Sequence, residues 1–129
     1  GIVPNQSPYH VHHCLVNMNT GKLVRLTEGD GTHRVQWSPD RKYLVDTWSR
    51  VDLAPRSVLR DASGKKIADL EEASLEALVK TGWKVPERFV AKGRDGKTDI
   101  WGVICKPTHF DTKRRYPVLE YIYAGPQGA

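Results

Sequence analysis

Four histidines near the start of the chain carry the side chain that most often binds a metal in proteins. They are His10, His12, His13 and His33. In a strand, His10 and His12 would share one face and His13 would take the other. Two imidazoles on one face can bind zinc weakly, but a full site needs further ligands. We therefore expect these histidines to be structural or exposed, and we predict no metal and no other cofactor.

Serine is the second residue type that could carry chemistry. A catalytic serine needs an adjacent base, and in many hydrolases it stands in a Gly-x-Ser-x-Gly turn between a strand and a helix. That motif does not occur in the chain. Ser38 and Ser49 fall in or beside predicted turns, and no aspartate and histidine are arranged around either. We therefore predict that the chain cannot complete a catalytic triad and is inactive alone.

The composition argues against two classes of function. The net charge is +5, but the only dense basic cluster, residues 113–115, lies in a predicted turn. A nucleic-acid binder gathers its charge on one face with aromatic residues between, so we predict no nucleic-acid partner. No apolar stretch approaches the length of a membrane span. Cys14 and Cys105 form neither a CxxC motif nor a disulfide framework, and we expect two buried free thiols.

Short strands joined by tight turns are predicted throughout residues 9–71. The turns carry Gly, Pro, Asn or Asp, which adopt the required φ or bond to their own backbone. The expected strands cover residues 9–17, 23–27, 33–37, 43–48, 57–60 and 66–70, with a longer loop at 49–55. The last four strands have roughly the length of one β-propeller blade. Residues 37–44 resemble the first hairpin of TolB-type propeller repeats, so residues 1–71 are interpreted as the C-terminal part of a propeller.

A helix and a second group of strands are predicted after residue 71. Residues 72–80 are helix formers that end near Gly82, and Glu71-Glu72 suits a first helical turn. A linker helix and connector therefore occupy residues 72–86. Residues 88–92 and 98–107 form an alternating hairpin, and residues 116–123 read as a buried central strand. Such a strand needs neighbours on both edges, which predicts that the chain is part of a longer protein.

Three stretches of the second half resemble the junction of dipeptidyl peptidase IV-type enzymes, serine exopeptidases of the prolyl oligopeptidase group. They are Glu87-Arg88-Phe89, residues 99–107, and residues 116–127 with their Tyr-Ala-Gly-Pro stretch. The family joins a β-propeller to an α/β-hydrolase domain. The resemblance therefore implies that residues 87–129 form the first strands of a truncated hydrolase domain. The expected fold class is mostly β, or α+β when taken as a fragment.

The resemblance also implies a role for one residue. In the family, a tyrosine hydroxyl after the third hydrolase strand helps to form the oxyanion hole, and by position that residue is Tyr123. A preorganised donor in a dry site stabilises the charge that acyl transfer places on a carbonyl oxygen. The nucleophile, acid and base of the family would lie beyond residue 129. The family also holds the substrate's amino terminus with paired glutamates on an earlier propeller element, which Glu71-Glu72 does not represent.

By the same resemblance, the longer protein would release N-terminal dipeptides with Pro or Ala in second position. Its partner would be a peptide substrate, it would form a homodimer, and it would work in the periplasm or at the cell surface. A non-catalytic module is the alternative interpretation, because propellers often bind partners and exposed strand edges can pair with another chain. Continuation of the natural polypeptide into a nucleophile turn would distinguish the two.

Overall fold

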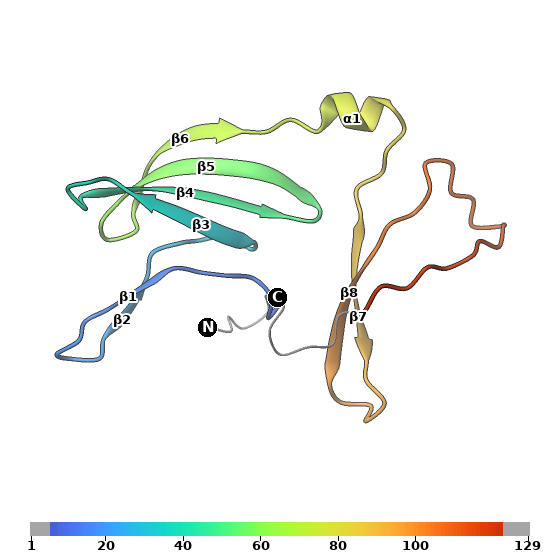
Figure 1. The fold of residues 1–129 in the computed structure, drawn as a ribbon, viewed down its shortest axis with the longest axis horizontal. Coiled ribbons are helices and arrows are strands. Elements are labelled where there is room, and N and C mark those ends of the chain that lie inside the picture. The colour runs from blue at the N-terminus through green and yellow to red at the C-terminus, as the bar shows by residue number, and fades with distance from the viewer. Residues whose placement is uncertain (1–5, 123–129) are drawn as a thin grey trace.

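The computed structural model describes residues 6–122, and its regular structure is mostly β, as predicted (Figure 1). A four-stranded antiparallel sheet has the strand order β3-β4-β5-β6, and two further antiparallel hairpins, β1–β2 and β7–β8, stand apart from it. The bounds are β1 Cys14–Val16, β2 Leu23–Arg25, β3 Thr32–Trp37, β4 Tyr43–Arg50, β5 Leu53–Asp61, β6 Lys66–Glu72, α1 Glu76–Lys80, β7 Glu87–Lys92 and β8 Asp99–Ile104.

In the four-stranded sheet, buried side chains alternate with less buried ones along the strands, and polar turns connect the strands. Leu44 of β4 and Val58 of β5 are buried on one face, together with Leu26, which follows β2. Gly64 lies in the β5–β6 turn with a φ of 91°, and a Cβ there would lie 2.7 Å from the Leu26 backbone. Only glycine therefore lets this turn approach Leu26 so closely. The strands expected at residues 33–37, 43–48, 57–60 and 66–70 are all present.

Two predicted boundaries around this sheet are wrong. The expected loop at residues 49–55 is a tight turn, because β4 runs on to Arg50 and β5 already begins at Leu53. Glu71 and Glu72 belong to β6 instead of a first helical turn, with Glu72 opposite Arg56 and bound to it at 2.6 Å. Cross-strand hydrogen bonds and this ion pair favour the extended backbone over the local helix propensity. The helix α1 therefore begins only at Glu76.

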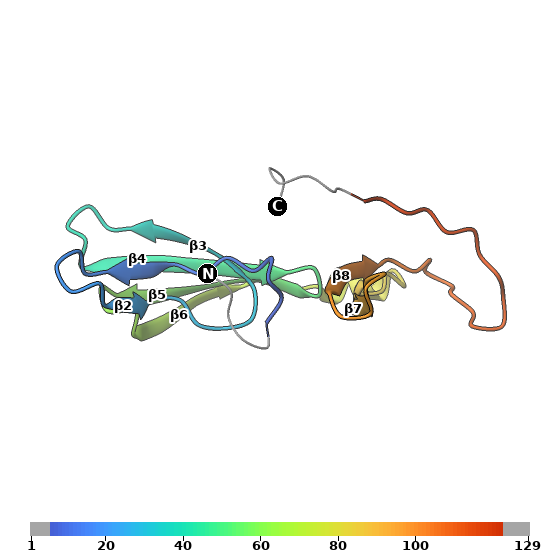
Figure 2. The ribbon, with the colours of Figure 1, turned by 90° about the horizontal axis from the view of Figure 1, so that it is seen from below.

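The β7–β8 hairpin lies beside one end of the four-stranded sheet, with α1 in the connection between them (Figures 1 and 2). Its turn is built on Asp95, whose carboxylate accepts hydrogen bonds from the Thr98 hydroxyl and from the amides of Lys97 and Thr98. The hydrogen bond from the Thr98 hydroxyl and those from the two amides lower the pKa of Asp95 to about 2. This loop therefore closes the hairpin with an ionised side chain at neutral pH.

The first and last parts of the described chain are less regular than the sequence predicts. Residues 9–13 do not form a strand, although the His33 amide donates to the Val11 carbonyl at 2.9 Å. The strand expected at 116–123 is absent from residues 116–122, where Leu119 is 99% exposed. A strand needs hydrogen-bonded neighbours, and no described segment pairs with this run. Residues 6–122 include no helix with the length and apolar character that a membrane crossing requires.

The two cysteines are free, as predicted, but both are exposed instead of buried. Cys14 lies on the two-stranded β1–β2 hairpin, where all six strand residues are exposed. Cys105 follows directly after β8, in a hairpin that is also largely uncovered. An alternating apolar pattern predicts burial only where another layer covers the strand, and these two hairpins have no such layer among residues 6–122.

Candidate functional site

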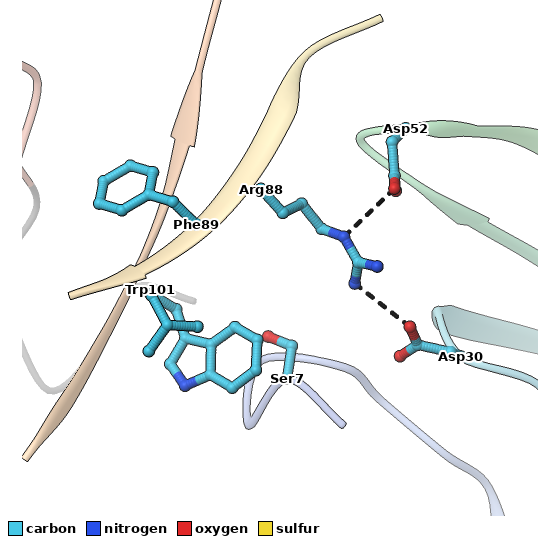
Figure 3. Close-up of a pocket in the computed structure, with 7 residues that line it drawn as sticks. Ser7, Asp30, Asp52, Arg88, Phe89 and Trp101 are labelled. Atoms are coloured by element: carbon cyan, nitrogen blue, oxygen red, sulfur yellow. Dashed lines mark hydrogen bonds and ion pairs between the residues drawn. The ribbon is translucent and has the colours of Figure 1, made fainter. Parts of the chain in front are cut away.

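A pocket of about 370 Å³ lies where the β7–β8 hairpin meets the end of the four-stranded sheet (Figure 3). Its wall comes from segments far apart in the sequence. The lining residues are Ser7, Asp30, Asp52, Arg88, Phe89, Val90 and Trp101. Figure 3 shows the Arg88 side chain extending from β7 between the two aspartates. Among the described residues, this is the place where charged groups of the sheet and of the hairpin meet.

Each aspartate is presented by a tight loop of the sheet. Asp30 stands between Gly29, whose φ is 103°, and Gly31, where a Cβ would lie 2.9 Å from the Ser49 carbonyl oxygen. The two glycines let this loop approach the end of β4 closely. Asp52 occupies the turn between β4 and β5. Both carboxylates therefore project from the same end of the sheet, toward the hairpin.

Two arginines hold both aspartates. Arg50 Nε donates to Asp52 Oδ1 at 2.7 Å, and Arg50 Nη1 donates to Asp30 Oδ2 at 3.0 Å. Arg88 Nη1 donates to Asp30 Oδ2, and Arg88 Nε lies near Asp52 Oδ2, each at 3.2 Å. His10 Nδ1 lies 2.7 Å from Asp30 Oδ1. We call these five residues the aspartate–arginine joint.

The electrostatics of the joint keep both carboxylates ionised. Burial alone would raise the pKa of Asp30, but the hydrogen bond from Arg88 and the proximity of His10 outweigh it and leave the pKa below its ordinary value. Burial also opposes ionisation of Asp52, and the hydrogen bond and charge of Arg50 again lower the pKa. All four carboxylate oxygens face donors, so neither aspartate is available as a general base or a metal ligand.

The histidines are engaged with protein groups. His12 lies 3.2 Å from the Thr27 hydroxyl and 2.8 Å from the Gln6 side-chain oxygen, and burial, followed by the charge of His33, lowers its pKa. His13 Nε2 donates to the His33 carbonyl at 3.2 Å. Within residues 6–122, no group of three His, Cys, Asp or Glu side chains could hold a metal ion.

Three buried polar residues meet in the sheet: His33, one of the histidines considered from the sequence, and Asp46 and Arg60, which were not identified from it. Asp46 is fully buried on β4 and accepts hydrogen bonds from His33 Nδ1 at 2.8 Å and from Arg60 Nε at 2.9 Å. The Arg60 guanidinium also donates to the Gly64 carbonyl at 2.9 Å. These three side chains occupy buried positions that alternate with less buried ones along their strands. A polar residue at such a position is the signal that the sequence offers. We call His33, Asp46 and Arg60 the buried trio.

The two serines considered from the sequence are not joined into a catalytic arrangement among the described residues. The Ser38 hydroxyl donates to Asp40 Oδ1 at 2.7 Å within the β3–β4 turn. This hydrogen bond stabilises the turn. Ser49 lies in β4 opposite Thr32. Tyr123, the predicted oxyanion-hole donor, lies outside the described residues, so its role stays a prediction.

Comparison with known proteins points to peptidases. The chain is 26% identical over 119 residues to Probable dipeptidyl-aminopeptidase B of Tuber melanosporum (strain Mel28), which covers 91% of this chain and 13% of that protein. It is 27% identical over 94 residues to Dipeptidyl peptidase 4 of Felis catus, which covers 73% of this chain and 12% of that protein. No protein-family model matches. The chain is therefore distantly similar to dipeptidyl peptidases and spans about an eighth of the length of these relatives.

Proposed function

We propose that this chain is part of a serine exopeptidase that releases N-terminal dipeptides with Pro or Ala in second position. The observation that carries the proposal is the similarity to dipeptidyl peptidases, which extends over 91% of the chain and thus includes both the four-stranded sheet and the hairpin. A chance match to one common β motif would not be expected to continue across two separate sheets.

The proposed organisation follows the sheets. Residues 1–71 are the C-terminal part of a β-propeller, and the four-stranded antiparallel order of β3 to β6 supports this because propeller blades have that form. Residues 72–86 are the linker with α1. Residues 87–129 begin an α/β-hydrolase domain. The exposed apolar side chains of Ile100, Val103 and Ile104 on the hairpin support a larger sheet that covers them in the longer protein.

In the proposed mechanism the catalytic serine, histidine and aspartate are supplied by other parts of the longer protein. The serine attacks the carbonyl after the second residue of the peptide, with the histidine as base and the aspartate as its orienting partner. The Tyr123 hydroxyl donates a hydrogen bond to the oxygen that becomes negatively charged. This chemistry requires no metal or organic cofactor. We further propose a homodimer that acts on peptides in the periplasm or at the cell surface.

The experiment that tests the proposal measures hydrolysis of a Gly-Pro chromogenic substrate by the full-length natural protein. Tyr123→Phe is expected to lower kcat on the order of 100-fold, because it removes one oxyanion donor without removing the ring. Tyr121→Phe is the matched control, since it removes a hydroxyl two residues away, and it should retain kcat. Equal kcat values for the two variants would contradict the oxyanion role. The isolated 129-residue chain should show no turnover.

Absence of activity in the full-length protein, together with a nucleophile turn that lacks its serine, would contradict the peptidase proposal. The function would then be that of a propeller-type interaction module, and partner capture would become the next measurement.

A further inference from the structure

The contact between the hairpin and the four-stranded sheet depends on few groups. Within residues 6–122, close contacts between strands occur only inside each sheet, so β7 and β8 do not pack against β3 to β6. Of the ion pairs in this part of the chain, the two that join the hairpin to the sheet both involve Arg88. Other charged pairs of the hairpin are internal, such as Lys92 with Asp99 and Lys106 with Glu87. The placement of the hairpin therefore rests strongly on one side chain.

The geometry of Arg88 can fix an orientation as well as a distance. Its Nη1 and Nε atoms bind carboxylates from two different loops, Asp30 before β3 and Asp52 after β4. A guanidinium presents its donors in a rigid plane, whereas a lysine ammonium is a single point charge. Two anchors on one rigid fork restrict rotation of β7 relative to the sheet, which one anchor cannot do.

Part of the joint lies within the sheet itself. Arg50 bridges the same two aspartates and also donates to the Asp30 carbonyl at 3.1 Å. Apart from the His10 ring, two carboxylates and one guanidinium leave one excess negative charge at this end of the sheet. Arg88 supplies a positive charge beside them. The sheet thus presents a site for a single guanidinium, and β7 places one there.

We infer that Arg88 is a positioning residue that fixes the β7–β8 hairpin, and whatever domain continues from it, at a defined angle on the four-stranded sheet. The saturated aspartates support this role over ligand binding, because each of their oxygens already faces a donor of the protein. Phe89 and Trp101 also line the pocket, and 30% of the Arg88 side chain remains exposed.

A consequence for catalysis follows if the proposed function holds. The joint would then connect the propeller to the hydrolase domain, and its angle would set where bound peptide lies relative to the catalytic groups. A displacement of about 1 Å in such an arrangement can reduce the rate on the order of 100-fold. Arg88 touches no reacting atom in this scheme and acts only through the relative position of the two domains.

The test measures that relative position directly. Spin labels on the substitutions Lys42→Cys, in the β3–β4 turn of the sheet, and Lys97→Cys, in the β7–β8 turn, report the distance between sheet and hairpin in the full-length protein, with Cys14 and Cys105 replaced by serine. Arg88→Met keeps most of the side-chain length and removes the fork, and it should broaden the distance distribution. Lys92→Met is the matched control, since it removes a cation of the same strand whose partner, Asp99, lies within the hairpin. It should leave the distribution unchanged.

Arg88→Lys is a second variant that is expected to fold even if Arg88→Met does not, because it keeps the positive charge and one of the two contacts with the aspartates. It should give an intermediate width, with circular dichroism like that of the wild type. Distributions for Arg88→Met and Arg88→Lys as narrow as that of the wild type would overturn the inference. The distance readout does not depend on peptidase activity, so it separates failure of the joint from failure of the proposed function. If the protein is active, Arg88→Met should lower kcat/KM at least about tenfold and Lys92→Met should not.

Discussion

At the scale of single residues, the sheet contains polar groups where its pattern calls for apolar ones. His33, Asp46 and Arg60 are each at most 2% exposed, beside a core whose buried apolar members in the described chain are Leu26, Leu44 and Val58. A carboxylate removed from water is stabilised only if its partners stay in place. Asp46 contacts both the imidazole of His33 and the guanidinium of Arg60. The stability of the buried trio therefore depends on the Asp46 carboxylate.

Asp46→Asn is expected to lower the free energy of unfolding by about 3–5 kcal/mol, because it leaves the Arg60 guanidinium buried without its main counter-charge. Urea unfolding of the variant measures the loss. Asp69→Asn is the control, since that side chain is exposed and, among residues 6–122, pairs only with Lys66, and it should cost less than about 1 kcal/mol. Similar losses for the two variants would show that the trio does not carry this share of the stability.

At the scale of elements, the sequence was sufficient where turns and alternation agree. The four strands between residues 32 and 72 and the hairpin at 87–104 were predicted because glycine, proline and aspartate mark their turns. The sequence does not predict the tight turn at Val51-Asp52. Arg50 and Asp52 bind each other there, and composition does not reveal this contact. The helix begins later than the pattern of residues 72–80 predicts, since cross-strand pairing with Arg56 holds Glu72 extended.

The hairpin has its own packing requirement at Gly102. A Cβ at this position would lie 2.2 Å from Cζ of Phe89, the residue opposite it on β7. Gly102→Ala is therefore expected to displace the aromatic ring and to destabilise the protein by about 1–3 kcal/mol in urea unfolding. In a Phe89→Leu background the smaller side chain leaves room for the methyl group. The same substitution should then cost less, and equal costs in both backgrounds would refute the contact.

At the scale of the whole molecule, the sequence did not predict the aspartate–arginine joint. Arg88 and Asp30 are 58 residues apart, and no periodic pattern relates them. Each charge alone reads as an ordinary exposed residue next to a turn or at the start of a strand. Their meeting depends on how the connector with α1 directs β7 toward the end of the sheet, which is a property of the tertiary structure. The oxyanion role of Tyr123 likewise came from family resemblance and not from any pattern in the chain.

The joint should weaken in acid. The pKa values of Asp30 and Asp52 are lower in the folded protein than their ordinary value of about 3.9, so the folded state binds fewer protons than the unfolded chain. Their contribution is complete above about pH 4 and is lost as the pH falls through the lowered values. The distribution of distances between labels at residues 42 and 97 is therefore expected to broaden below pH 4 in the protein with Arg88 intact.

Arg88→Met provides the control for this titration, because its joint lacks the hairpin's guanidinium at every pH. Its distance distribution should already be broad at pH 7 and should change little on acidification, as long as circular dichroism shows that the strands persist. Added salt should act in the same direction as acid on the wild type, since these half-exposed pairs are screened by ions. A wild-type distribution that stays narrow in acid and at high salt would mean that the charges of the joint do not hold the hairpin in place.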